Sequence, residues 1–177
     1  MKATGIVRRI DDLGRVVIPK EIRRTMRIRE GDPLEIYTNR DGEVIFKKYS
    51  PVGDLGNFVT ELCESMSRTT GLSCAICDRD AVIAAAGSAK KELFDKSISP
   101  TLEKQMETRK TYEKGSGVSE IEICDDRKAA VVSPIIAGGD VSGCVVFLDE
   151  NDSRKIGQSE LMLAQTAANF LGKQMEM

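Results

Sequence analysis

Four basic side chains recur at helical spacing near the start of this 177-residue chain: Lys20, Arg23, Arg24 and Arg27. At about 100° per residue they fall on one face of a helix. The planar guanidinium group of arginine suits phosphate oxygens and guanine edges alike, so this face predicts nucleic-acid binding. A solvated charged face is the alternative interpretation of any charge run. The spacing alone leaves both open.

Charge is distributed unevenly along the chain. Residues 1–50 hold 12 Lys and Arg against 8 Asp and Glu, whereas residues 51–177 hold 14 against 20. The overall formal charge of -2 therefore conceals a basic N-terminal module joined to an acidic remainder. Such a concentration of positive charge is typical of a nucleic-acid-binding surface.

Histidine is absent from the sequence. This excludes a Ser–His or Cys–His nucleophile pair, a His metal cluster and a His-ligated haem. Cys74 and Cys77 match C-x-x-C, but they lie in an apolar run typical of a strand, where positions three apart point to opposite faces. We therefore expect all five cysteines to be buried and structural. The sequence predicts no catalytic residue, no metal site and no cofactor.

The first fifty residues predict the order β-β-α-β-β. A unit below about 60 residues buries too little surface to stand alone without a metal or a disulfide. We therefore expect a homodimer, which would double the basic surface. The expected elements are strands at Thr4–Ile10 and Arg15–Ile18 around a turn at Asp11–Gly14, a helix at Pro19–Arg27, and a hairpin of Leu34–Thr38 with Glu43–Tyr49.

The run D-x-L-G-R-V-V-I-P from Asp11 to Pro19, followed by Glu21–Arg24, resembles the AbrB-type DNA-binding domain. In that family two chains interleave into a swapped-hairpin β-barrel dimer that binds double-stranded DNA. The resemblance covers almost all of residues 1–50. Strand alternation places Arg9 on the face opposite Arg8, so the resemblance implies a DNA contact of Arg9 less directly than one of Arg8. The implied DNA contacts are Arg8, Arg15, Arg23 and Arg24, then Arg9, with Lys2, Lys20 and Arg27 as secondary phosphate ligands.

A short helix and a loop differ from the recognition helix of helix-turn-helix proteins. We therefore expect DNA shape and deformability to dominate specificity, with few base contacts. If each chain of a dimer places about four arginines on phosphates, the logarithm of the binding constant falls with log salt at a slope of roughly -7.

Proline and glycine end the N-terminal module at Ser50–Asp54, where Asp54 can cap a following helix. We expect a DNA-binding and dimerisation domain at 1–50, a linker at 51–55 and a second domain at 56–177. The sequence of the second domain predicts helices and strands in the order α-β-β-α-β-β-β-α, with Gly71 as the C-cap of the first helix.

This order of elements, with Ser133–Ile136, a Gly-Gly-Asp turn and Gly143–Phe147, is similar to a GAF domain. The resemblance implies a small-molecule sensor or dimerisation module built on a central antiparallel sheet. The N-K-x-F-x-D-E signature of cyclic-nucleotide subtypes and the Cys–His pair of bilin subtypes are both lacking. An unidentified small-molecule ligand and a ligand-free structural domain both stay open.

The expected C-terminal helix carries two apolar faces. One face could cover the sheet and the other a partner helix in a four-helix bundle, giving a homotetramer. One wide face buried within a monomer is the alternative. The first face is a heptad-like seam of Leu161, Ala164, Ala168, Leu171 and Met175, and the second consists of Leu163, Ala167 and Phe170.

The sequence thus predicts an α+β protein with an N-terminal dimerising DNA-binding module and a C-terminal GAF-like domain. The whole chain resembles regulators of late forespore genes in spore-forming bacilli. An antitoxin with the same N-terminal fold and a toxin partner is the alternative function. No apolar run approaches the roughly 20 residues that span a bilayer. We therefore expect no membrane partner and a cytoplasmic, nucleoid-associated protein.

Overall fold

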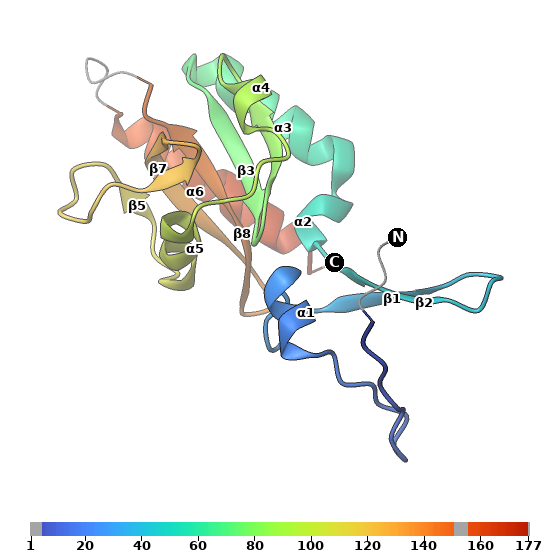
Figure 1. Ribbon diagram of the computed structural model, residues 1–177. Coiled ribbons are helices and arrows are strands. Elements are labelled where there is room, and N and C mark those ends of the chain that lie inside the picture. Colours follow the sequence, from blue (N-terminus) through green and yellow to red (C-terminus); the bar gives the residue numbers. More distant parts are fainter. Residues whose placement is uncertain (1–4, 151–155, 177) are drawn as a thin grey trace. The chain divides into compact units, whose positions relative to one another are not determined.

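The computed structural model describes residues 5–150 and 156–176. The chain divides into two compact units between Tyr49 and Ser50 (Figure 1). The first unit has a two-stranded sheet and the second a six-stranded sheet. Within the described residues, no helix combines the length and apolar character needed to cross a bilayer.

The first unit contains one short helix and one hairpin. The side chain of Asn39 closes the hairpin turn, because its Oδ1 accepts hydrogen bonds from the backbone N–H groups of Asp41 and Glu43. The predicted hairpin is therefore confirmed. The elements are α1 (Lys20–Thr25), β1 (Leu34–Thr38) and β2 (Val44–Lys48), with β1 and β2 antiparallel.

Neither of the two strands predicted before α1 is formed within residues 5–19, where the structure describes a single turn. The turn is closed by hydrogen bonds from the Asp11 N–H to the Arg15 carbonyl at 3.1 Å and from the Gly14 N–H to the Asp11 carbonyl at 3.0 Å. A strand requires a paired neighbour, and neither run pairs with a segment of its own chain. Their apolar side chains stand exposed: Val7 by 86%, Ile10 by 69% and Val17 by 70%.

The sheet of the second unit is antiparallel throughout, in the order β4-β3-β8-β7-β5, with β6 also pairing with β7. The strands are β3 (Cys74–Asp78), β4 (Val82–Ala86), β5 (Tyr112–Glu113), β6 (Glu122–Cys124), β7 (Arg127–Ala137) and β8 (Asp140–Leu148). The helices are α2 (Pro51–Asp54), α3 (Gly56–Thr70), α4 (Lys90–Leu93), α5 (Pro100–Glu107) and α6 (Gln158–Gln174).

The helices form a layer on each side of this sheet (Figure 1). On one side α3 and α6 contribute to a core that includes Val59, Cys63, Ala164, Leu171, Ile76 and Phe147. On the other side α4 and α5 cover a core that includes Leu93, Leu102, Met106, Val132 and Val146. Gly71 ends α3 in the left-handed conformation, with φ of +68°, as predicted.

The segment expected as a linker contains α2. The Ser50 hydroxyl caps this turn by accepting a hydrogen bond from the Gly53 N–H at 3.1 Å, and it donates one to the Asp78 carboxylate at 2.8 Å. Val52 is fully buried in the second unit. Asp54 does not cap α3, whose N-cap is Leu55. The chain is therefore anchored in the second unit from Ser50 onward.

All five cysteines are free and buried. Cys74 and Cys77 belong to the cores on opposite sides of the sheet, as the spacing predicted. The Cys63 Sγ lies 3.4 Å from the Cys74 Sγ, well beyond the roughly 2.05 Å of a disulfide bond. The hydrogen bond with Cys74 and the burial of the thiol raise the pKa of Cys63 far above its ordinary value.

We expect the native protein to leave all five thiols unmodified when treated with a thiol-specific disulfide reagent, and to expose five after denaturation. The thiolate is the reactive form, and burial disfavours it. A colorimetric thiol titration with and without guanidinium chloride measures this. Rapid stoichiometric reaction of the native protein would contradict the buried placement.

Candidate nucleic-acid interface

Helix α1 presents the predicted basic face to solvent. Pro19 is its N-cap, so the helix begins one residue later than expected, at Lys20. Lys20, Arg23 and Arg24 are exposed, whereas Ile22 is partly buried. Arg23 and Arg24 stand in the last turn, where a positive charge complements the negative end of the helix dipole. The helix therefore exposes these three cations to solvent.

Arg27 does not lie on the helix, which ends at Thr25. Its backbone is left-handed, with φ of +51°. The Ile28 N–H returns to the Arg23 carbonyl at 2.8 Å and closes the end of the helix. The exposed side chain of Arg27 thus projects from a turn rather than from the helix face.

Arg15 is held by an aspartate. Asp11 Oδ1 accepts a hydrogen bond from the Arg15 backbone N–H at 2.8 Å, and Asp11 Oδ2 accepts one from the Arg15 Nε at 2.7 Å. These bonds from the backbone and then the side chain of Arg15 place the pKa of Asp11 below its ordinary value. Asp11 therefore orients the candidate residue Arg15, a contact that the sequence did not single out. The available signal was an aspartate opening a tight turn, four residues before an arginine.

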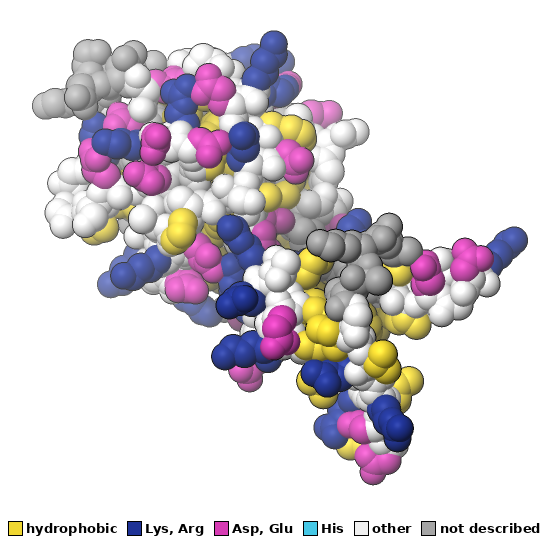
Figure 2. Space-filling view, viewed as in Figure 1, with side chains coloured by type: hydrophobic (Ala, Val, Ile, Leu, Met, Phe, Trp, Pro, Cys, Tyr) yellow, Lys and Arg dark blue, Asp and Glu magenta, His cyan; other side chains and the backbone are white. Residues whose placement is uncertain are grey.

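The remaining predicted residues lie on the N-terminal arm, which comprises residues 5–19, or outside the described chain. Arg8 and Arg9 are exposed on the arm, and Lys2 falls outside the described residues. Figure 2 shows dark blue Lys and Arg side chains of the first unit interspersed with exposed hydrophobic ones. The predicted DNA-binding cations of the described chain thus lie on two segments: the arm, and α1 with its following turn.

In the second unit, a carboxylate at the end of the sheet binds two hydroxyls. Glu150 accepts hydrogen bonds from the Ser88 Oγ at 2.6 Å, from the Ser73 Oγ and from the Ser73 N–H. Partial burial disfavours its charged form, but these bonds outweigh that effect and lower the pKa of Glu150. The cluster joins the end of β8 to β3 and to the segment after β4, which is a structural role.

The described part of the second unit carries no cluster of three or more His, Cys, Asp or Glu side chains suited to a metal ion, nor does that of the first. The core beneath α4 and α5 includes the buried side chains of Leu93, Leu102, Met106 and Tyr112.

Two protein families match the chain. Residues 54–176 match the family described as stage V sporulation protein T C-terminal, transcription factor. Residues 7–54 match the family described as antidote-toxin recognition MazE, bacterial antitoxin. The AbrB-type resemblance has a counterpart in the transition state regulatory protein AbrB of Bacillus subtilis (strain 168). It is 63% identical over 51 residues, which are 29% of this chain and 52% of that protein.

Solved structures show the fold of the second unit. The cyanobacteriochrome receptor PixJ matches with a TM-score of 0.55 at 12% identity, over 72% of this chain and 98% of that one. The second GAF domain of DevS from Mycobacterium smegmatis matches with a TM-score of 0.52 at 14% identity, over 68% and 92%. The predicted fold class, an AbrB-like N-terminal domain with a GAF-like domain on an antiparallel sheet, is confirmed.

A full-length relative completes the comparison. Stage V sporulation protein T of Bacillus subtilis (strain 168) is 51% identical over 184 residues, which cover 99% of this chain and 99% of that protein. Since both the C-terminal family and this relative extend over most of the sequence, the chain belongs to the stage V sporulation protein T family of transcription factors.

Proposed function

We infer that this chain binds double-stranded DNA and regulates the transcription of sporulation-stage genes. The observation that carries the inference is the exposed pair Arg23 and Arg24 on α1, in a module with 63% identity to AbrB. Membership of a transcription-factor family supports a non-enzymatic role. The DNA contacts we propose are Arg8, Arg9, Arg15, Arg23 and Arg24, with Lys2, Lys20 and Arg27 as secondary phosphate ligands.

Fluorescence anisotropy of a labelled promoter-length duplex, titrated with the full chain across a salt series, tests this function. Counterion release by about eight phosphate contacts per dimer predicts a slope of about -7 in log K against log salt. A slope near -2 would contradict that number of contacts. Absence of binding at low salt would shift the function to a protein partner.

The match of residues 7–54 to an antitoxin family favours a second candidate, in which the module binds DNA and a toxin. The folded second unit argues against it, because antitoxins of this kind end in a short acidic disordered tail. Limited proteolysis separates the two. A stable fragment of about residues 52–177 supports the regulator, and rapid loss of that region supports the antitoxin.

The exposed apolar side chains of the first unit support a homodimer. Val7, Ile10 and Val17 on the arm are joined by Ile36 and Phe46 on the hairpin, which are 61% and 41% exposed. Exposed apolar surface of this extent marks an association site. A second copy that pairs its arm with these segments would form the missing strands and cover their side chains.

The outer surface of α3 and α6 supports a homotetramer. In α6 the heptad-like seam faces the core, where Ala164, Ala168 and Leu171 are buried. Of the second face, Ala167 is buried in the same core and Leu163 packs against it, whereas Phe170 is 44% exposed. The ring centroid of Phe170 lies 5.8 Å from that of Phe58 on α3. Two such helix pairs would close a four-helix bundle between dimers. We propose that this assembly, or an unidentified small molecule, sets DNA affinity in a nucleoid-associated cytoplasmic protein.

Phe170→Glu is expected to halve the native mass measured by light scattering. A buried unpaired carboxylate disfavours the bundle, whereas the exposed position leaves the monomer core intact. The wild type should give about four times the 19.4 kDa chain mass and the variant about twice. Phe94→Glu, at a phenylalanine that is 56% exposed at the end of α4 on the other side of the sheet, is the control. A wild type that scatters as a monomer refutes the assembly.

A further inference from the structure

The turn after α1 holds an arginine where glycine is usual. The Ile28 N–H bonds to the Arg23 carbonyl at 2.8 Å and the Arg27 N–H to the Arg24 carbonyl at 3.3 Å. This is the Schellman arrangement, whose left-handed position glycine occupies without steric cost. Arg27 takes that position with φ of +51°. A side chain there strains the backbone, so the surrounding contacts must maintain it.

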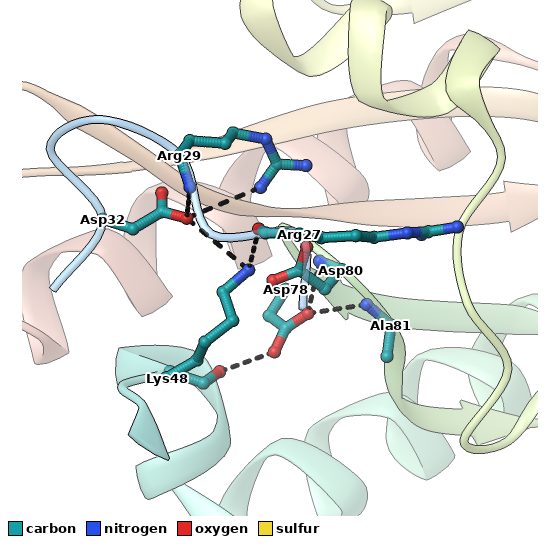
Figure 3. A network of polar contacts seen from close by, with 8 residues as sticks. Arg27, Arg29, Asp32, Lys48, Asp78, Asp80 and Ala81 are labelled. Carbon is teal, nitrogen blue, oxygen red and sulfur yellow. Dashed lines mark hydrogen bonds and ion pairs between the residues drawn. The ribbon is translucent and has the colours of Figure 1, made fainter. Parts of the chain in front are cut away.

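Two side chains from later in the chain supply such contacts (Figure 3). Lys48 Nζ, at the end of β2, donates a hydrogen bond to the Arg27 carbonyl at 2.7 Å and lies 3.5 Å from the Asp32 Oδ2. The same Asp32 oxygen accepts a hydrogen bond from the Arg29 N–H at 2.8 Å. The Asp32 side chain is only 4% exposed, so water screens this contact less than it screens a surface ion pair.

We propose that Asp32 and Lys48 are positioning residues for DNA binding, an inference that rests on the proposed function. They connect the hairpin to the turn at Arg27. Within that turn the Ile28 N–H donates a hydrogen bond to the Arg23 carbonyl. The contact therefore determines where the last turn of α1 lies. It orients Arg23, Arg24 and Arg27 toward phosphates, and neither Asp32 nor Lys48 has to touch DNA itself.

The sign of the effect of Asp32→Asn distinguishes positioning from charge. Removing a negative charge beside a polyanion strengthens binding by simple electrostatics. Positioning predicts the opposite, about tenfold weaker binding of the duplex at fixed salt, which corresponds to about 1.4 kcal/mol. Glu30→Gln, an exposed neighbour with the same charge change, is the matched control and should bind as well as the wild type or slightly better. Equal or tighter binding by Asp32→Asn overturns the proposal.

Lys48 gives a second, independent measurement. Lys48→Met should weaken binding about as much as Asp32→Asn, because the Arg27 carbonyl loses its donor. Lys48→Arg should restore affinity to within about threefold of the wild type, since a guanidinium can reach both the carbonyl and the carboxylate. If Lys48→Met lowers the salt slope by about two per dimer while Asp32→Asn is neutral, Lys48 is a direct phosphate ligand and the proposal is wrong.

A double-variant cycle tests the link to the strained turn. The glycine of Arg27→Gly relaxes the left-handed backbone. In that background Asp32→Asn should therefore lower the affinity for the duplex by less than about threefold. A tenfold loss of affinity from Asp32→Asn in both backgrounds would contradict the role of the turn. Circular dichroism and light scattering establish that each variant is folded and assembled. If the wild type does not bind DNA, the proposed function is wrong. If the wild type binds and these variants bind with the same affinity, only the positioning role is wrong.

Discussion

Arg23→Ala/Arg24→Ala should weaken binding of a promoter-length duplex by about a hundredfold or more near physiological salt. Each dimer loses four cations from the exposed ends of its two α1 helices. The salt slope should fall from about -7 to about -4, because fewer counterions are released on binding. Anisotropy titrations across a salt series measure both quantities on the same samples.

The control removes the same number of positive charges elsewhere. Lys104→Ala/Lys110→Ala takes two exposed lysines from the second unit and should change affinity by less than about threefold, through net charge alone. Equal losses in both double variants would mean that net charge, and not this surface, governs binding. Retained binding by a folded Arg23→Ala/Arg24→Ala variant would place the interface on other residues.

Gly143→Ala should lower the free energy of unfolding of the second unit by about 3 kcal/mol. Gly143 lies in β8, the strand between β3 and β7. A Cβ at this position would lie 2.1 Å from the Cys77 carbonyl oxygen and 3.1 Å from the Asp78 Cα. Both are backbone atoms of β3, so the methyl group must force the two strands apart. Circular dichroism during urea unfolding, followed through the helices α3 and α6, measures the loss.

Gly139→Ala separates this collision from backbone conformation. Gly139 has φ of +87°, and a Cβ there would meet no atom within 4 Å. Its substitution should cost about 1 kcal/mol from left-handed strain alone. If Gly143→Ala unfolds at the same urea concentration as the wild type, the strands separate more readily than the described packing implies.

Local signals in the sequence predicted those elements that a single chain completes by itself. The hairpin of Leu34–Thr38 with Glu43–Tyr49 was predicted, Gly71 predicted the end of α3, and the spacing of Cys74 and Cys77 predicted that they point to opposite faces of the sheet. The strands before α1 could not be judged in this way, because a strand depends on its neighbour as well as on its own residues. The helical turn at 51–54, which Ser50 caps, also escaped prediction, because the sequence indicated only a linker there and a cap at Asp54 for the following helix.

The basic face was predictable because it depends on helical spacing, and the structure places Lys20, Arg23 and Arg24 on α1 as expected. The partners of the arginines were not predictable. Asp11 bonds to Arg15 only because the turn brings them together. The contact between Asp32 and Lys48 joins the turn to the end of a strand, so it exists only once the chain has folded. The charge composition of the sequence therefore predicts a basic surface, whereas the positions of its arginines depend on tertiary contacts.

The unpaired arm has a consequence for the order of assembly during synthesis. The ribosome produces residues 5–19 before the second unit, whose two cores are completed within one chain. In the proposed dimer the arm is synthesised first and folds last, because its strands form only when a second chain pairs with them. Melting of the first unit should then depend on protein concentration more steeply than melting of the second unit, because the strands of the first unit form only in the dimer. Dilution would thus switch off DNA recognition before it unfolded the rest of the molecule.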